Sequence, residues 1–371
     1  MKLLTLLSFT LIFSNYGISQ QSYNTIDING VSREYYQYLP TAYDPQTESL
    51  PVLFTLHGIG GTALATSGYG LNGIADNERF IPVYLQGMTN GWGQTSWNNG
   101  TLLESNAEDL AFISNLLDSL NADPAVNIDM SRVYMTGISM GSIMTYNACR
   151  YMSDRIAAVV CHIGTMSTED MNNFNPAYPV PTLHKHGTND QTVPYDTNPL
   201  PSLSLVPETI EQLKITNGWQ GDSTVTAIPD LASDGITVDK IVYNTTTPLE
   251  LWRMNDAGHV LLFMPSNDTN STDVTWEFLK QHTHPNPSTA SQTAHEKIEF
   301  DLYPNPTSSE LVFVHYNSFD TYSIYEASGK LIASDIPTTY HIDVTDLQNG
   351  LYIFEFRSKS GQIVRKRITK E

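Results

Sequence analysis

The amino-acid sequence predicts an α/β fold with a mostly parallel sheet and flanking helices, followed by a small all-β sandwich domain. Three observations indicate this fold class. Short apolar runs that end at glycine recur through the first half of the chain, segments with helical periodicity separate them, and short alternating strands begin at Ile298. Runs that are apolar throughout are typical of strands buried on both faces of a parallel sheet.

The apolar runs predict five buried strands, and helical patterns separate them. The strands are PVLFTLH at 51–57, FIPVYLQG at 80–87, RVYMTG at 132–137, RIAAVVCHIG at 155–164 and PTLHKHG at 181–187. Helices are expected at 107–120, where apolar residues line one stripe behind an acidic first turn, and at 271–282. Strands that alternate with helices indicate an open α/β sheet.

The start of the chain differs from the α/β region at 20–283. Residues 1–19 combine one lysine, an apolar core and small residues near Ser19, which is the layout of a cleavable signal peptide. The apolar run from Leu3 to Phe13 is about half of the roughly 20 residues that span a bilayer. We therefore expect an exported protein, secreted or at the cell surface, without a stable membrane span.

A linker and a second domain are expected after the α/β region. Residues 284–298 are rich in proline, serine and threonine and lack apolar periodicity, which is typical of a linker. Residues 299–371 hold short alternating strands separated by turn pairs such as Asn349-Gly350. This pattern predicts the β-sandwich domain.

The composition excludes one class of partner. The 371 residues include 19 Lys and Arg against 39 Asp and Glu, which gives a formal net charge of −20. Because such an excess of carboxylates repels phosphate backbones, no nucleic acid is expected as a partner. The two cysteines, Cys149 and Cys161, are compatible with one disulfide or with two buried thiols.

Ser139 is the candidate nucleophile. It lies between Gly137 and Gly141 in the pattern G-x-S-x-G, directly after the strand expected at 132–137 and before a helical stretch. A sharp turn from strand to helix requires glycine on both sides of the serine, because side chains there would collide with neighbouring backbone. The turn would present Ser139 Oγ at the carboxyl end of the sheet.

A serine nucleophile needs a base and an acid, and in this fold both follow it in the chain. His259 lies in a loop after the apolar strand LELWRM and shortly before the last helix, which is the position of the base. Asp190 follows the strand at 181–187 immediately and is the preferred acid; Asp196 and Asp256 are the alternatives.

Two backbone amides are expected to stabilise the oxyanion that forms when the serine attacks a carbonyl group. One belongs to Met140, directly after the nucleophile. The other is assigned to Ile59, in the glycine-rich stretch that follows the first long buried strand.

The remaining histidines suggest no metal site. His57, His184 and His186 are scattered over strand ends without the short-spaced ligand pairs of transition-metal sites, so no metal is expected. His184 and His186 alternate within one expected strand and are interpreted as structural.

Residues 25–283 resemble the polyhydroxybutyrate depolymerase and feruloyl esterase group of α/β-hydrolases. The segments that carry the resemblance, in chain order, are LPVLFTLHGIGG, GWGQTSWNNG, IDMSRVYMTGISMGSIMTYNACR, HGTNDQTVPY, TNGW and AGH. The resemblance implies hydrolysis of carboxylic esters by Ser139, Asp190 and His259 without a cofactor. The chain departs from the group at Ser142, where glycine is frequent, and at 260–262, where Trp-Pro commonly follows the histidine.

Three aromatic residues are candidates for substrate binding. Trp92 and Trp97 fall in a loop on the rim that would carry the nucleophile, and Tyr195 follows the expected acid. Each ring is equally compatible with stacking on a sugar or aromatic acyl group and with packing its own loop.

The C-terminal region, from LYPNP at 302–306 to VRKRITKE, resembles the C-terminal sorting domain of the type IX secretion system. A carbohydrate-binding module is the alternative. The resemblance implies that the secretion machinery is a partner, that the chain crosses the outer membrane, and that the tail is removed.

The sequence therefore predicts a secreted serine carboxylic ester hydrolase that forms an acyl-enzyme. Feruloyl or acetyl esters of plant polysaccharide are the preferred substrates, and a polyester is the second choice. A non-catalytic binding protein on a hydrolase scaffold is the alternative from another class.

Overall fold

The structure is a computed structural model of the chain. It describes residues 20–198, 200–263, 266–287, 302–313, 319–326, 330–337, 339, 341–358 and 363–371. The predicted signal peptide at 1–19 and most of the predicted linker lie outside the described residues.

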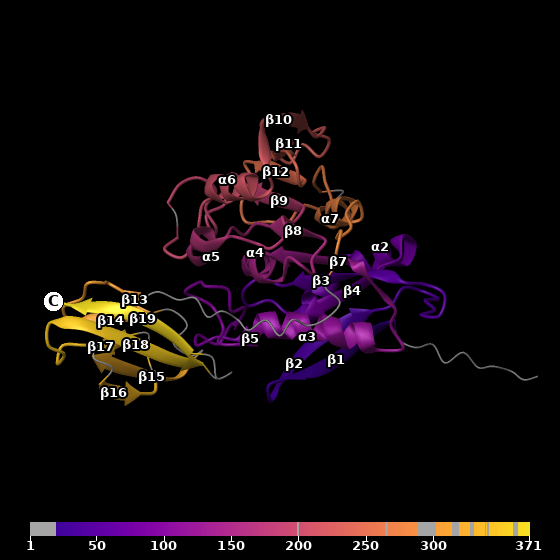
Figure 1. Cartoon of the computed structure of the whole chain (residues 1–371). Helices are drawn as coiled ribbons and strands as arrows, with labels where there is room; N and C mark the ends of the chain where they lie inside the picture. Colours follow the sequence, from indigo (N-terminus) through magenta and orange to yellow (C-terminus); the bar gives the residue numbers. More distant parts are fainter. Residues whose placement is uncertain are drawn as a thin grey trace, which may run out of the picture.

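A ten-stranded sheet forms the centre of the α/β region, with the strand order β1-β2-β4-β3-β7-β8-β9-β12-β11-β10 (Figure 1). The strands are β1 Gln21–Ile28, β2 Val31–Tyr38, β3 Leu50–Leu56, β4 Ile81–Leu85, β7 Ile128–Ile138, β8 Ala158–His162, β9 Thr182–Gly187, β10 Trp219–Ala227, β11 Thr237–Thr245 and β12 Leu249–Asn255. The six strands from β4 to β12 are parallel, and an antiparallel hairpin extends each edge.

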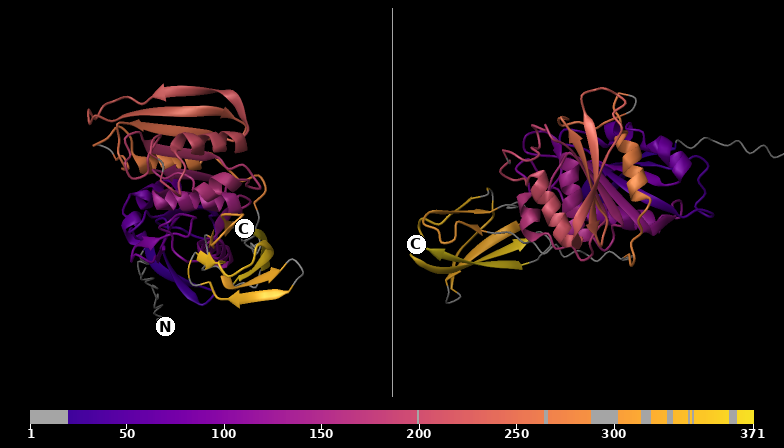
Figure 2. Two further views of the ribbon diagram at one scale, coloured as in Figure 1. Left: turned by 90° about the vertical axis from the view of Figure 1, so that its left-hand side faces the viewer. Right: turned by 90° about the horizontal axis from the view of Figure 1, so that it is seen from above.

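Helices cover both faces of this sheet. They are α1 Ala63–Ser67, α2 Leu71–Glu78, α3 Asp109–Ala122, α4 Met140–Met152, α5 Thr168–Asn173, α6 Val206–Thr216 and α7 Ser271–Leu279. One buried cluster joins α3, α4 and α6 to alternate strand residues, and a second cluster joins α1, α2 and α7 to the residues between them. The right-hand view of Figure 2 shows α7, in orange, on one side of the strands and the pink and magenta helices on the other.

The predicted α/β architecture is confirmed. All five predicted strands are present, and β3, β4, β8 and β9 are buried over their whole length. The predicted helix at 107–120 corresponds to α3, and the one predicted at 271–282 ends earlier, at Leu279. Both cysteines are buried and free.

The folded α/β region extends slightly further than the sequence predicted. His284, which was assigned to the linker, is 5% exposed. Its amide donates to Ser131 O at 2.8 Å, and its Nε2 lies 3.0 Å from Ser153 O. The prediction that the linker begins at 284 is therefore wrong, because these contacts fasten His284 to the α/β region.

The C-terminal residues form two antiparallel sheets, with strand orders β13-β14-β17 and β16-β15-β18-β19. Their strands are β13 Leu302–Tyr303, β14 Glu310–Phe313, β15 Phe319–Glu326, β16 Leu331–Asp335, β17 His341–Asp343, β18 Gly350–Ser358 and β19 Ile363–Lys370. Side chains from both sheets share one buried cluster, as expected of a small sandwich. A separate two-stranded ribbon, β5 Met88–Thr89 and β6 Thr95–Ser96, lies in the α/β region.

No helix in the described part of the chain is both long and apolar enough to cross a bilayer.

Candidate active site

Ser139 occupies a strained turn between β7 and α4. Its φ of 54° and ψ of −117° are unfavourable for a residue with a side chain. A Cβ on Gly137 would lie 2.1 Å from Gly141 O, and a Cβ on Gly141 would lie 2.3 Å from Leu56 O. The prediction that both flanking positions must be glycine is confirmed, since no side chain fits at either.

The turn brings Ser139 into a hydrogen-bonded chain with two residues that are distant in sequence. His259 Nε2 lies 2.9 Å from Ser139 Oγ, and His259 Nδ1 lies 2.7 Å from Asp190 Oδ2. Asp190 follows β9 and His259 follows β12, so both loops leave the same edge of the parallel sheet as the turn after β7. This geometry permits His259 to accept the serine proton while Asp190 holds the Nδ1–H tautomer.

Asp190 is the carboxylate that the structure brings to His259. It is 2% exposed, whereas both alternatives, Asp196 and Asp256, are exposed. Burial alone would raise the pKa of Asp190, but hydrogen bonds from His186, His259 and the Val193 amide outweigh it and hold that pKa well below its usual range. The carboxylate is therefore ionised near neutral pH.

Of the two amides predicted for the oxyanion, one directly follows the nucleophile in the chain and the other lies in a loop that passes close to it. Met140 is the first residue of α4, and the loop holding Ile59 passes so close to Ser139 that a Cβ on Gly58 would lie 3.9 Å from Ser139 Oγ. Among the described residues, the Gly60 amide donates to Thr95 O, while the amides of Ile59 and Met140 have no protein acceptor. Neither amide is therefore engaged by another part of the described chain.

Trp97 supports the loop that holds Ile59 and does not reach the cleft. Its side chain is fully buried, its Nε1 donates to His57 O at 2.8 Å, and its ring lies 4.9 Å from the His57 ring. The His57 ring in turn spans from Gly58 O, 2.7 Å from Nδ1, to the Gly87 amide, 2.9 Å from Nε2. Trp97 as a substrate-binding residue is therefore wrong; it packs the loop.

A cleft of about 530 Å³ opens beside Ser139 and His259. Its walls include the two aromatic rings of Tyr69 and Phe263, whose centroids are 5.9 Å apart. Trp92, which is 67% exposed, and Tyr195, which is half-buried near His186, are not among the lining residues. Neither Tyr69 nor Phe263 was predicted from the sequence, because neither belongs to a recognisable motif.

The two departures from the resembled group have different surroundings. Ser142 is fully buried, and its hydroxyl lies 2.7 Å from both Gly137 O and His162 O, so it ties α4 to the ends of two strands. Val260 and Leu261 line the cleft. The second departure thus changes the wall beside the histidine.

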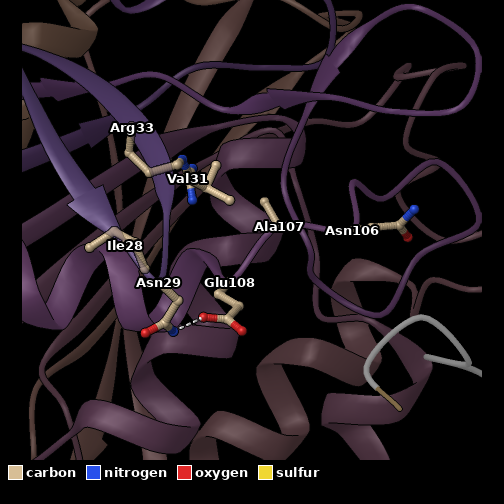
Figure 3. Close-up of a pocket in the computed structure, with 7 residues that line it drawn as sticks. All are labelled: Ile28, Asn29, Val31, Arg33, Asn106, Ala107 and Glu108. Carbon is tan, nitrogen blue, oxygen red and sulfur yellow. Dashed lines mark hydrogen bonds between the residues drawn. The ribbon is translucent and has the colours of Figure 1, made fainter. Parts of the chain in front are cut away.

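A second hollow, of about 450 Å³, lies between the turn of the β1–β2 hairpin and the segment before α3 (Figure 3). The Asn29 amide donates to the Glu108 carboxylate across it, and Asn106 points away from these two. The Arg33 guanidinium beside it is paired with buried Asp109. This hollow lacks a nucleophile with an adjacent base.

Among the described residues, no group of three or more His, Cys, Asp or Glu side chains is arranged to hold a metal ion.

Two segments of the chain match known families. Residues 42–202 match the phospholipase/carboxylesterase family, and residues 301–370 match the secretion system C-terminal sorting domain.

Three individual proteins are similar to parts of the chain. The bifunctional acetylxylan esterase/xylanase XynS20E of Neocallimastix patriciarum is 32% identical over 169 residues, which is 45% of this chain and 22% of that protein. Feruloyl esterase B of Piromyces equi is 31% identical over 152 residues, which is 40% of this chain and 28% of that protein. The match therefore spans less than a third of either relative. The structure of the acetyl xylan esterase from Aspergillus awamori superposes with a TM-score of 0.50 at 16% identity, covering 68% of this chain and 99% of that one, and supports the fold alone.

Proposed function

We propose that this chain, whose residues 42–202 match the phospholipase/carboxylesterase family and whose residues 301–370 match the secretion system C-terminal sorting domain, is an exported serine carboxylic ester hydrolase. The observation that carries the proposal is the continuous chain of hydrogen bonds from Ser139 Oγ through His259 to Asp190, 2.9 and 2.7 Å long. A buried carboxylate, a histidine and a serine in this arrangement generate a nucleophile at neutral pH.

In the first half of the proposed reaction, Ser139 Oγ attacks the ester carbonyl carbon while His259 Nε2 takes the hydroxyl proton. The carbonyl oxygen becomes an oxyanion, which the amides of Met140 and Ile59 stabilise. His259 then gives its proton to the departing alcohol, and the acyl group remains on Ser139 as an ester.

The second half of the reaction repeats these steps with water in place of the serine. His259 removes a proton from a water molecule, the resulting hydroxide attacks the acyl carbon, and the same two amides hold the oxyanion. Collapse of the intermediate releases the acid and returns the proton from His259 to Ser139. Asp190 stays ionised throughout and stabilises the imidazolium that forms in each half.

Feruloyl or acetyl esters of plant polysaccharide are the proposed substrates. Two similar proteins are named as an acetylxylan esterase and a feruloyl esterase. The aromatic rings of Tyr69 and Phe263 in the cleft wall suit a planar acyl group. A polyester is the second candidate, since a poly(3-hydroxyalkanoate) depolymerase from Paucimonas lemoignei is 32% identical over 98 residues.

A panel of esters that differ in the acyl group tests the function. We expect kcat/KM to be highest for methyl ferulate or for an acetylated xylo-oligosaccharide, and lower for 3-hydroxybutyrate oligomers. Tyr69→Ala should lower kcat/KM for the ferulate more than for the acetate, because the acetyl group is too small to span the aromatic wall. EDTA should leave every rate unchanged.

The outcomes of the panel separate the alternatives. The highest rate on the hydroxybutyrate oligomer would assign the protein to polyester hydrolysis. Failure to hydrolyse any ester, together with no labelling by a fluorophosphonate, would indicate a binding protein on a hydrolase scaffold.

We also propose that the α/β region works without the C-terminal sandwich, as an exported esterase with a removable sorting tail would require. A chain that ends at Pro287 should keep wild-type kcat/KM and melting temperature for the α/β region. A chain that ends at Gln281 is the matched control. It should melt several degrees lower, because it lacks the buried His284 and the His282 carbonyl that accepts from Tyr134. Loss of activity in the longer form would mean that the sandwich completes the site.

A further inference from the structure

Asp190 has a second histidine on the oxygen that accepts from His259. His186 Nε2 lies 3.2 Å from Asp190 Oδ2 and 2.8 Å from Val193 O. The other Asp190 oxygen accepts from the amides of Thr192 and Val193, at 2.8 and 2.9 Å. The acid is therefore held from four directions, of which only the His259 contact belongs to the Ser-His-Asp arrangement itself.

Two further buried side chains, those of His184 and Tyr146, extend the contact with His186 into the protein interior. His184 Nε2 lies 3.2 Å from His186 Nδ1, and the two rings stack with an interplanar angle of 7°. The Tyr146 hydroxyl lies 2.6 Å from His184 Nδ1. All three side chains are 0% exposed, the two histidines on β9 and the tyrosine on α4.

The partners determine which nitrogens carry protons. His186 Nε2 faces two acceptors that have no proton, the ionised Asp190 carboxylate and a backbone carbonyl, so Nε2 donates. A neutral His186 ring that donates through Nε2 accepts at Nδ1, and His184 Nε2 then donates to it. His184 Nδ1 is then an acceptor too, and the Tyr146 hydroxyl donates to it. Every donor in the chain points toward Asp190.

We propose that Tyr146, His184 and His186 form a positioning relay, which supplies Asp190 with an additional N–H donor and so sets how strongly Asp190 attracts the His259 proton. The inference rests on the proposed function, because it concerns the same triad. A donor on Oδ2 withdraws negative charge from the oxygen that His259 faces, and it also fixes the carboxylate plane. The three relay residues touch no reacting atom, so they act through Asp190.

Other ionisable groups face this relay. Burial lowers the pKa of His184 well below its usual range, and His186 and His162 add to that effect. Cys161 and Cys149 lie near Tyr146, whose pKa burial raises well above normal. The Tyr195 ring approaches His186 at 6.1 Å. No carboxylate other than Asp190 is bonded to the three relay side chains within the described residues.

The test compares His186→Leu, which removes the donor, with His186→Gln, whose amide can still donate to Asp190. For His186→Leu we expect kcat to fall roughly tenfold, because the plane of the Asp190 carboxylate is no longer fixed; this is the scale of losing a hydrogen bond to a charged group. KM should change little. In a plot of kcat/KM against pH, the acidic limb of this variant should move to higher pH. The reason is that a more negative Asp190 holds the proton on the His259 imidazolium more strongly. His186→Gln should restore most of kcat and the wild-type limb.

The far end of the relay supplies a matched pair of tyrosines. Tyr146→Phe removes the donor to His184, whereas Tyr134→Phe removes an equally buried hydroxyl that donates to His282 O, outside the relay. Of these two tyrosine variants, only Tyr146→Phe should move the acidic limb of the pH profile. Equal profiles of kcat/KM against pH for the two tyrosine variants would overturn the proposal, and this comparison holds even if His186→Leu does not fold. Where the leucine variant does fold, a glutamine variant that is as impaired would overturn it as well.

A spectroscopic measurement separates this proposal from the proposed function. The low-field proton resonance of His259 Nδ1–H should move further downfield in His186→Leu and in Tyr146→Phe than in Tyr134→Phe. That readout needs no turnover. An unchanged resonance would contradict the relay in an active enzyme, whereas a shifted resonance in a chain that hydrolyses no ester would contradict only the proposed function.

Discussion

Replacing Ser139 with alanine should lower kcat/KM for the best ester by about 10⁶-fold, which is the scale of losing a covalent nucleophile. In the part of the chain that the structure describes, no hydroxyl other than that of Ser139 is hydrogen-bonded to His259. The next serine, Ser142, is fully buried and directs its Oγ to Gly137 O and His162 O. The melting temperature should change little, because alanine at this position would keep the same backbone turn. Steady-state kinetics and thermal unfolding of the purified variant measure both effects.

Ser142→Ala is the matched control for this prediction. It removes a serine hydroxyl three residues further along, at the cost of a buried hydrogen bond that contributes about 1 kcal/mol. Its kcat/KM should stay near that of wild type while its melting temperature falls. If Ser142→Ala were the inactive variant and Ser139→Ala the active one, the assignment of the nucleophile would be wrong.

Replacing Asp190 with asparagine should lower kcat by about 10⁴-fold through the wrong histidine tautomer. The Oδ1 of Asp190 accepts from two backbone amides, at Thr192 and Val193, so an asparagine would place its oxygen there. Its NH₂ group would then face His259 Nδ1, which would have to become the acceptor. The ring proton would move to Nε2, the atom that must be free to accept the Ser139 proton.

Asp196→Asn and Asp256→Asn provide the controls for this change. Both residues are exposed, and neither is bonded to His259 among the described residues. We expect kcat within about twofold of wild type for each, as for ordinary surface substitutions. A severe loss in Asp256→Asn with normal turnover in Asp190→Asn would reverse the identity of the acid.

The sequence predicted the central strands well because their surroundings are uniform. β3, β4, β8 and β9 have neighbours on both faces, so most of their side chains are apolar. The edge hairpins were not predicted, because their residues carry no such signal. β10, for example, is exposed along its whole length and owes its place to backbone pairing with β11.

The candidate site also contains residues that the sequence predicted and residues that it did not. Ser139, Asp190 and His259 were found because a parallel sheet brings successive strand ends to one edge, so their order in the chain implied their proximity. The sequence could not distinguish aromatic residues that bind substrate from those that pack a loop, since the burial of a tryptophan in a glycine-rich loop cannot be predicted from its neighbours. Trp97 is buried beneath its loop, and the two rings that line the cleft, Tyr69 and Phe263, come from segments with no motif.

His186 shows a further limit of sequence reasoning. Its alternation with His184 in an apolar strand indicates a buried, structural histidine, and it is buried. The alternation does not reveal that the Asp190 carboxylate lies four residues later and 3.2 Å away in space, which depends on the turn after β9.

If Ser139 is the nucleophile, it carries the acyl group during turnover, and that intermediate can be trapped on the protein. The purified protein would be mixed with an activated ferulate ester, quenched in acid within the first turnovers, and analysed by intact mass and peptide mapping. We expect one added feruloyl group on the peptide that contains Ser139, at high occupancy in Asp190→Asn, in which deacylation is slowed, and none in Ser139→Ala. An acyl group on another residue, or rapid hydrolysis without any adduct in Ser139→Ala, would contradict this expectation.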